Sequence, residues 1–344
     1  MFKSTPLIVA TLCLAACGSE DKPNNDTANS TAATTETGTG TTGTGTTTST
    51  GTTTGTGTTT GTGTGTTTTD RPPPAYGLSN NTLFHNDVDR TYRLYVPESY
   101  DHSTAVPLMM NFHGFGGTSN EQLSTSNMRP LANAHNFLLV YPQGTRLDGF
   151  NHWNTYPPGG ENKSDALDYQ FVDEMLAVLS ADYNIDASRV YATGYSNGGD
   201  FSHTLACFLS DKVAAIAPVS GSLWTETRNG CVVDHPTAVM SFQGTRDEVR
   251  PIDGIAGYML SVSAMTDHWR DANNITGDAT LTEYSSSGMD IERYQYDGGD
   301  GDVQQVHYIM NRGGHDWFSF SEDGADMDEI IWNFVSQFDQ DGLR

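Results

Sequence analysis

The stretch Val-Tyr-Ala-Thr-Gly-Tyr-Ser-Asn-Gly at residues 190–198 decides the fold of this chain. Its first four residues favour a buried strand, and a helical pattern begins at Asn197. Between strand and helix stands the pentad Gly-Tyr-Ser-Asn-Gly, whose two glycines permit a sharp turn that passes close to neighbouring backbone. The pattern predicts a nucleophilic serine, Ser196, at the carboxyl end of a strand. An ordinary glycine-rich turn is the alternative.

Apolar runs and helical segments alternate on both sides of this stretch. Short apolar runs bounded by turn residues are typical of buried parallel strands, and Asp168 is placed to cap the helical segment that it opens. The alternation predicts an α/β fold in which a mostly parallel sheet carries helices on both faces. The active site of such a sheet lies at the carboxyl ends of its strands. The predicted strands are 91–96, 106–112, 137–141, 190–193, 214–219, 237–242, 292–296 and 303–310, and the predicted helices are 121–135, 168–183, 197–209, 255–273 and 326–338.

A second glycine-rich loop, Phe-His-Gly-Phe-Gly-Gly at residues 112–117, closes an earlier predicted strand. In folds with a nucleophile turn of this kind, such a loop supplies one N–H group to the oxyanion hole. The residue after the nucleophile supplies the other. We therefore assign the oxyanion hole to the N–H groups of Phe115 and Asn197, with Gly114 or Gly116 as alternatives for the first.

The order of residues along the chain selects the general base. Folds with such a nucleophile turn place the nucleophile first along the chain, the acidic residue second and the histidine last. His113 precedes the serine, so we expect it to hold its own loop. His315 lies on a glycine-rich loop after the last predicted strand, whereas His268 and His307 lie inside a predicted helix and a predicted strand. We therefore expect His315 to take the proton from Ser196.

The acidic member of the triad is expected on a loop that follows a strand. Asp247 meets this condition, because it comes shortly after the predicted strand 237–242. Glu248 and Asp253 are the competitors, and both fit a solvated face better. Asp247 would hold the imidazole of His315 in the tautomer that accepts a proton from the serine.

The first residues have the pattern of an export signal. Lys3 precedes an apolar run at residues 7–16. This run is too short for a membrane-spanning helix, which needs about 20 residues. The run leads into Cys17 through Leu-Ala-Ala, which resembles a bacterial lipobox. We expect residues 1–17 to be a lipoprotein signal with Cys17 lipidated, so that the protein is anchored at the cell surface or outer membrane. Secretion without a lipid is the alternative.

Residues 18–74 differ in composition from the rest of the chain, because threonine and glycine make up almost all of 35–69. Such a segment cannot bury an apolar face, so we expect a disordered tether. Residues 75–344 then form one α/β domain of ordinary size. The formal net charge of the chain is −25, which repels nucleic acid and other polyanions. We expect no nucleic-acid partner.

Two cysteines remain in the domain, Cys207 and Cys231. In an exported domain such a pair favours one structural disulfide, with two reduced buried thiols as the alternative. The sequence has neither Cys-x-x-Cys nor His-Glu-x-x-His, so we expect no metal site. The acidic run 297–302 lacks the spacing of a calcium loop and lies between predicted strands, which favours a hairpin turn.

Motifs along most of the domain resemble those of the α/β-hydrolase esterases, a group that includes bacterial polyhydroxybutyrate depolymerase-like proteins and feruloyl esterases. The resemblance implies an α/β-hydrolase core without a separate lid domain, and it supports the triad of Ser196, Asp247 and His315. The two cysteines also match a disulfide of some members. The resembling segments are Arg90–Pro97, His113–Gly114, Tyr141–Gly144, Trp153–Asn154, Asp168 with Phe171–Val172, Asp186 with Arg189–Gly199, Gln243–Asp247 and Gly313–Trp317.

The resemblance implies a serine carboxylic-ester hydrolase that works through an acyl-enzyme and needs no cofactor. Its substrates would be feruloyl or acetyl esters of plant polysaccharide, or polyhydroxyalkanoate-type polyesters. Gln170 and Gln243 stand where the group often has Gly and His, which leaves the substrate open. The alternatives are a non-catalytic cell-surface binding protein on a hydrolase fold and a serine peptidase. We expect a monomer whose only membrane contact is its lipid.

Aromatic residues near the expected site are candidates for substrate contacts. Trp153 and Tyr156 lie in the loop 150–158, and Trp317 lies two residues after His315. Together they would form an apolar wall for an aromatic acyl group or a polyester chain. Packing of the loops by these tryptophans is the alternative.

Overall fold

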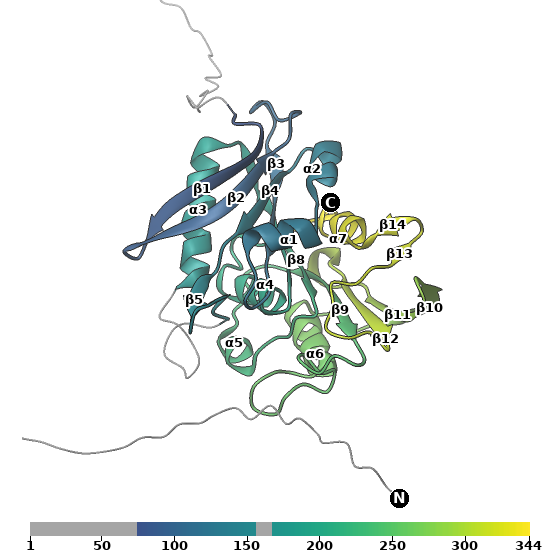
Figure 1. Ribbon diagram of the computed structural model, residues 1–344. Coiled ribbons are helices and arrows are strands. Elements are labelled where there is room, and N and C mark those ends of the chain that lie inside the picture. Colours follow the sequence, from purple (N-terminus) through teal and green to yellow (C-terminus); the bar gives the residue numbers. More distant parts are fainter. Residues whose placement is uncertain (1–73, 156–166) are drawn as a thin grey trace, which may run out of the picture. The chain divides into compact units, whose positions relative to one another are not determined.

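The computed structural model describes residues 74–155 and 167–344, which belong to one compact unit of the chain (Figure 1). Several expectations lie outside these residues: the signal at 1–17 with Cys17, the tether as far as residue 73, and Tyr156. Among the described residues, none of the helices is long and apolar enough to cross a membrane.

A ten-stranded sheet forms the centre of the unit, in the order β1-β2-β4-β3-β7-β8-β9-β12-β11-β10. The strands from β4 to β12 in this order pair in parallel, and the two outermost strands at each edge pair antiparallel. The prediction of a mostly parallel sheet is therefore confirmed. The strands are β1 (Gly77–His85), β2 (Val88–Val96), β3 (Val106–Phe112), β4 (Leu138–Pro142), β7 (Ile185–Tyr195), β8 (Ala215–Val219), β9 (Ala238–Gly244), β10 (Thr280–Ser286), β11 (Met289–Tyr296) and β12 (Gln305–Asn311).

Helices cover both faces of this sheet, as predicted. Side chains of the central strands alternate between two apolar clusters, so that Leu108 and Met110 enter one cluster and Met109 enters the other. The first cluster includes residues of α3 (Asp168–Asp182), α4 (Asn197–Phe208) and α6 (Val262–Ala272), and the second includes residues of α1 (Ser119–Thr125), α2 (Arg129–His135) and α7 (Met327–Val335). The remaining short elements are α5 (Thr225–Gly230), a 3-10 turn (Asp300–Asp302) and the ribbons β5–β6 (Thr145–Leu147, Phe150–His152), β13–β14 (Ser321–Glu322, Ala325–Asp326) and β15–β16 (Phe338–Asp339, Gly342–Leu343).

Two predicted helices differ from the observed ones. The predicted helix 121–135 is two helices, and the second begins with a proline in its first turn. The predicted helix 255–273 begins only at Val262, because Gly257 adopts a positive φ angle of 81° and Ser261 caps the helix by accepting from the N–H of Ala264. The acidic run 297–302 connects the antiparallel strands β11 and β12, as predicted for a hairpin.

The prediction that Asp168 caps α3 is wrong. Leu167 occupies the cap position, and Asp168 is the first helical residue and is buried. Its carboxylate accepts hydrogen bonds from the guanidinium of Arg90 at 2.7 Å and from the N–H of Asn154 at 2.8 Å. A buried charge needs a charged partner, and Arg90 lies on β2, too far along the chain for local sequence patterns to reveal the pair.

Candidate active site

Ser196 lies on the sharp turn between β7 and α4, with φ 54° and ψ −117°. A Cβ at Gly198 would lie 2.3 Å from the carbonyl oxygen of Phe112, and one at Gly194 would lie 2.6 Å from the backbone of Gly198. Both positions therefore require glycine, as the pentad predicts. The N–H of Ser196 donates to the carbonyl of Val219 at 2.9 Å, which fixes the turn against β8. The serine is thus held in a strained conformation.

Ser196, His315 and Asp247 form a chain of hydrogen bonds. Nε2 of His315 lies 2.7 Å from Oγ of Ser196, and Nδ1 lies 2.7 Å from Oδ2 of Asp247. With its proton on Nδ1, the imidazole donates to the carboxylate and accepts from the serine hydroxyl. The structure thus brings together the three residues selected from the sequence, at distances that suit proton transfer.

The environment of Asp247 favours its carboxylate form. Burial acts to raise the pKa of this carboxyl, but hydrogen bonds from His315 and from the N–H groups of Arg250 and Val249 outweigh it and lower the pKa below its usual value. The competing carboxylates of Glu248 and Asp253 are exposed.

The other histidine candidates have structural partners. His307 lies in β12, and its ring nitrogens are bonded to the hydroxyls of Ser241 and Thr266. His268 lies in α6, and its ring packs edge-on against Trp269.

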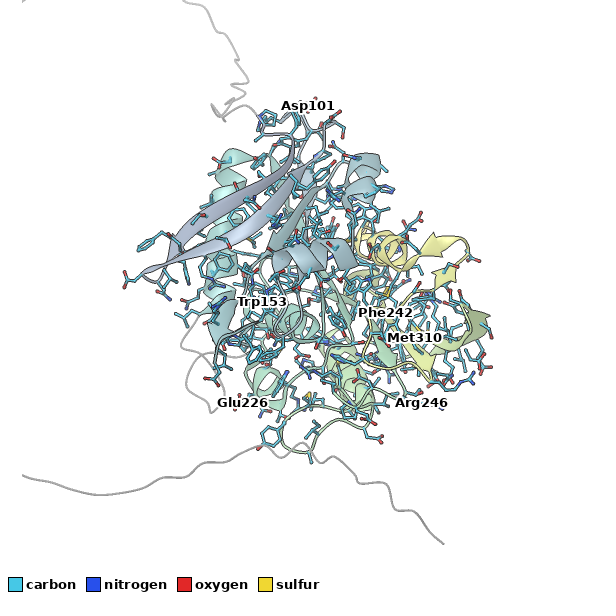
Figure 2. All side chains as sticks on the ribbon, viewed as in Figure 1. Asp101, Trp153, Glu226, Phe242, Arg246 and Met310 are labelled. Carbon is cyan, nitrogen blue, oxygen red and sulfur yellow. A yellow bond between two sulfur atoms is a disulfide. The ribbon has the colours of Figure 1, made fainter. Side chains whose placement is uncertain are left out.

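The loops that follow β9 and β12 are bonded to each other, which places the carboxylate and the imidazole together. The N–H of Arg246 donates to the carbonyl of Gly313 at 2.8 Å, and the N–H of Arg312 donates to Oγ1 of Thr245 at 2.7 Å. Figure 2 labels Arg246 on the first of these loops. The hydroxyl of Tyr195 donates to the carbonyl of His315 at 2.6 Å. His315 is therefore held from both β7 and β9.

The loop after β3 is held by His113, as predicted. Nδ1 of this ring lies 2.7 Å from the carbonyl oxygen of Gly114, and Nε2 lies 3.0 Å from the N–H of Gly144. Burial lowers the pKa of His113 to about 4, so the ring is neutral at pH 7. Within the loop, the N–H of Gly116 donates to the carbonyl of Asn151 at 2.7 Å. The N–H of Gly116 is therefore already bonded within the protein, which leaves the N–H of Phe115 or of Gly114 as the oxyanion donor from this loop.

Trp153 does not line a substrate surface, contrary to the prediction. Its side chain is 1% exposed and stacks on Phe201 of α4 with ring centroids 4.9 Å apart, and Figure 2 labels its position. Its indole N–H donates to the carbonyl of His113 at 3.0 Å. The side-chain amide of Asn197 bonds both the N–H and the carbonyl of Trp153, at 2.6 and 3.0 Å. The indole thus packs beneath the loop, because Asn197 holds its backbone against α4.

Trp317 is half-buried and packs against the apolar cluster that contains α7. The indole N–H of Trp317 donates a hydrogen bond to the carboxylate of Asp328 in α7. The same carboxylate accepts a hydrogen bond from the hydroxyl of Ser126 at 2.8 Å. Burial raises the pKa of Asp328 to about 6. Trp317 therefore has a packing partner beside the site, and its predicted contact with substrate stays a prediction.

A buried ion pair behind the triad was missed by sequence reasoning. The guanidinium of Arg250 bonds the carboxylate of Asp200, with a shortest distance of 2.6 Å, and Asp200 also accepts from the N–H of Ser222 at 2.7 Å. Asp200 lies in the first turn of α4, where an acidic residue is usually explained by the helix dipole. The pair joins the helix behind Ser196 to the loop of Asp247.

The predicted disulfide is present between Cys207 of α4 and Cys231, which follows α5. His268 has a ring nitrogen close to the two sulfur atoms, and these three side chains form the one group in the described part of the chain with closely spaced metal-ligand atoms. Because both sulfur atoms are in the disulfide, they are not thiolate ligands.

Known proteins that are similar to this chain are named esterases. The family model named Esterase, described as "Putative esterase", matches residues 86–327. A bifunctional acetylxylan esterase/xylanase of Neocallimastix patriciarum is 28% identical over 74% of this chain and 34% of its own length. Feruloyl esterase B of Piromyces equi is 27% identical over 70% of this chain and 44% of its own length. The chain therefore spans less than half of either relative.

Two further comparisons cover more of the compared protein. Feruloyl esterase C of Emericella nidulans is 27% identical over 61% of this chain and 76% of its own length. The solved structure of an acetyl xylan esterase from Aspergillus awamori has a TM-score of 0.54 and 14% identity, covering 76% of this chain and 99% of that one. Such a likeness between structures shows a shared fold. The chain has the α/β-hydrolase fold and belongs to the esterase family whose model it matches.

Proposed function

We propose that this chain is a serine carboxylic-ester hydrolase that works through an acyl-enzyme. The observation that carries the proposal is the chain of two 2.7 Å hydrogen bonds from Ser196 through His315 to Asp247. An uncoupled serine is a weak nucleophile at neutral pH, and an adjacent base that is itself oriented by a carboxylate activates it.

The first half of the reaction acylates Ser196. Its Oγ attacks the ester carbonyl carbon while Nε2 of His315 takes the hydroxyl proton, and Asp247 stabilises the resulting imidazolium. The carbonyl oxygen becomes an oxyanion, which the N–H groups of Phe115 and Asn197 would bind. His315 then returns the proton to the departing alkoxide, and the C–O bond of the ester breaks.

The second half repeats these steps with water. His315 takes a proton from a water molecule, whose oxygen attacks the acyl carbon, and the bond to Ser196 Oγ breaks as that oxygen regains a proton. The products are a carboxylic acid and an alcohol, and the reaction requires no cofactor.

The relatives favour esters of plant polysaccharide as the substrate class, because the proteins similar to this chain are named feruloyl and acetylxylan esterases. Polyhydroxyalkanoate-type polyesters stay the second candidate class. A binding protein on an inactive hydrolase fold is disfavoured, because such a protein would not need the hydrogen bonds that join Ser196, His315 and Asp247.

Turnover of p-nitrophenyl acetate by the full chain and by Ser196→Ala tests the proposal. We expect the substitution to lower kcat by a factor of about 10⁴ or more, because the triad acts as a unit. A fluorophosphonate should label wild-type protein at Ser196, as read by peptide mass spectrometry. Equal turnover by both proteins, or labelling at another residue, would contradict the proposal.

We also propose that Cys17 carries a lipid and that residues 18–74 tether the hydrolase to a membrane. The support is the lipobox-like sequence before Cys17 and the threonine- and glycine-rich composition after it. Cys17→Ser should move the protein from the membrane fraction to the soluble fraction without changing its specific activity. A Cys17→Ser protein that still sediments with membranes would rule out the anchor.

A further inference from the structure

Arg250 is the residue through which the turn after Asp247 packs into the protein. Of residues 248–250, all of which the structure describes, the first two are exposed and only Arg250 turns its side chain inward, where it is 12% exposed. Oδ1 of Asp247 accepts hydrogen bonds from the N–H groups of Val249 and Arg250, at 2.8 and 2.7 Å. Oδ2 of the same carboxylate is bonded to His315. The main chain of Arg250 therefore helps to set the direction in which the triad carboxylate faces the imidazole.

The side chain of Arg250 ends at the helix that follows the nucleophile. Its guanidinium donates to both oxygens of the Asp200 carboxylate, at distances from 2.6 to 3.2 Å. Asp200 lies in the first turn of α4 with its side chain fully buried, and its own N–H donates to the carbonyl of Ser196 at 2.8 Å. One arginine thus connects the turn that orients Asp247 with the helical turn that begins after Ser196.

Further contacts fix this ion pair in place. The carboxylate of Asp200 also accepts from the N–H of Ser222, at 2.7 Å, in the segment after β8. The guanidinium of Arg250 lies 5.8 Å from the centre of the Trp224 ring in the same segment. Burial acts to lower the pKa of Arg250, but the carboxylate of Asp200 outweighs it and raises the pKa, so the guanidinium stays charged. Both members of the pair are therefore charged and held at defined positions.

Stability alone does not account for an ion pair at this place. Removal of two charges from water costs about as much free energy as their attraction returns, and an apolar pair of similar volume often stabilises a fold equally well. A guanidinium, however, bonds a carboxylate in fixed directions, which specifies how the two segments that carry them are placed. The triad needs such a specification, because His315 must lie at hydrogen-bond distance from Ser196 and Asp247 at the same time.

We infer that the ion pair of Arg250 and Asp200 positions the triad. It fixes the turn of Asp247 relative to α4, so that the carboxylate keeps its hydrogen bond to His315 while the imidazole reaches Ser196. The inference rests on the proposed hydrolase function, to which it adds two positioning residues. Both residues act through Asp247 and take no part in bond formation or proton transfer.

The hydrogen bond between His315 and Asp247 can be followed directly by NMR. In the full chain labelled with nitrogen-15, the Nδ1–H group of His315 gives a low-field proton resonance, identified by its absence in His315→Gln. We expect Arg250→Met to move this resonance to higher field, because the carboxylate turns away and the hydrogen bond lengthens. Arg90→Met is the matched control. The ion pair of Arg90 with Asp168 is equally buried but lies at β2, so its loss should leave the resonance unchanged.

Kinetics test the same inference through the reaction. Arg250→Met should lower kcat for p-nitrophenyl acetate by a factor of about 10 to 100 with little change in KM, because a misplaced carboxylate affects proton transfer and not ester binding. The double variant Asp200→Asn/Arg250→Met removes both charges and keeps an acceptor for the N–H of Ser222. It should regain most of the melting temperature that Arg250→Met loses. Its kcat should stay low and its resonance shifted, because an amide and a thioether do not fix the turn.

Three results would overturn the inference. The first is an unshifted resonance in Arg250→Met. The second is a double variant that regains kcat together with stability, which would mean that the pair only braces the fold. The third is an equal shift in Arg90→Met, which would mean that the resonance follows stability and not the position of Asp247. If the wild-type protein hydrolyses no ester, the proposed function fails, and the resonance alone decides whether the pair positions Asp247.

Discussion

The loop after β3 and the loop after β12 each carry a histidine, but the two rings have different roles. Both nitrogens of His113 are bonded to backbone groups, and the ring is fully buried with a pKa lowered to about 4. The ring of His315 bonds a carboxylate on one side and the serine hydroxyl on the other, and it is 18% exposed. The partners of the two ring nitrogens decide which histidine can exchange a proton with the serine.

The two loops also differ in what they leave available to a substrate. The first loop is fastened by its own backbone and by Asn151, and it carries the exposed ring of Phe115. In the proposed reaction, the second loop delivers a group that changes its protonation state in each half-reaction. One loop would therefore bind the charge that develops during the reaction, and the other would move the proton.

Substitution of each histidine in turn should separate these roles, and one of the two substitutions should give the largest effect that we expect. His315→Ala should lower kcat by about 10⁴-fold with little loss of stability, because it removes the proton acceptor. His113→Ala should reduce kcat far less, but it should lower the free energy of unfolding by about 1–3 kcal/mol, because the buried N–H of Gly144 loses its acceptor. Steady-state kinetics and urea denaturation measure the two effects. A folded His113→Ala protein as inactive as His315→Ala would break the distinction.

Acid should destabilise the protein through histidines that are buried as neutral rings. Burial lowers the pKa of His113, His268 and His307 to about 4 and that of His203 to about 3, so below pH 6.5 the unfolded chain binds protons that the folded chain does not. Their contribution to stability is complete above pH 6.5 and is lost as the pH falls from there toward 4.

One carboxyl opposes this loss. Burial raises the pKa of Asp328 to about 6, so the folded chain keeps a proton there that the unfolded chain releases, and this contribution grows as the pH falls through 6. The net difference is about three protons, which corresponds to a slope of roughly 4 kcal/mol per pH unit between pH 6 and 4.5. Urea denaturation at several pH values measures the slope. His113→Ala should reduce the slope by the contribution of one proton, about 1.4 kcal/mol per pH unit. An unchanged slope would show that His113 is not a neutral buried ring.

Removal of the disulfide should have the smallest effect on the loops that carry His113 and His315. Cys207 and Cys231 are 24 residues apart, and the loop that they close stabilises the fold by about 3 kcal/mol in the chain-entropy model. The double variant Cys207→Ser/Cys231→Ser should therefore melt at a lower temperature, while its kcat and pH profile at 25 °C stay those of the wild type. Full activity together with a reduced melting temperature is the expected pair of results. A changed pH profile would show that the disulfide positions the triad.

The sequence predicts the parts of this molecule that local patterns encode. The pentad around Ser196 and the rule of residue order are enough to select His315 and Asp247, and runs of apolar residues locate the central strands. The edge strands β1 and β10 were missed because nearly all of their residues are exposed or half-buried and few of them are apolar. An edge strand has little to bury, so hydrophobic periodicity cannot mark it.

Residues whose roles depend on a distant partner could not be predicted. Asp200 pairs with Arg250, which lies 50 positions later, and Asp168 pairs with Arg90, which lies 78 positions earlier. Trp153 illustrates the same limit, because an aromatic residue in a loop suggests a ligand surface until the bonds from Asn197 are known. Local propensity says nothing about such pairs, since tertiary contacts alone create them.

At position 196, the positive φ angle of the serine lowers the stability of the fold, whereas the proposed reaction needs the serine hydroxyl. A residue with a Cβ at φ 54° is strained by about 1–3 kcal/mol, whereas glycine adopts this conformation freely. Laboratory evolution for thermostability alone would therefore favour glycine at position 196 and give an inactive protein with a higher melting temperature. Any such selection on this protein needs a simultaneous screen for hydrolysis, because selection for stability alone favours variants that have lost the nucleophile.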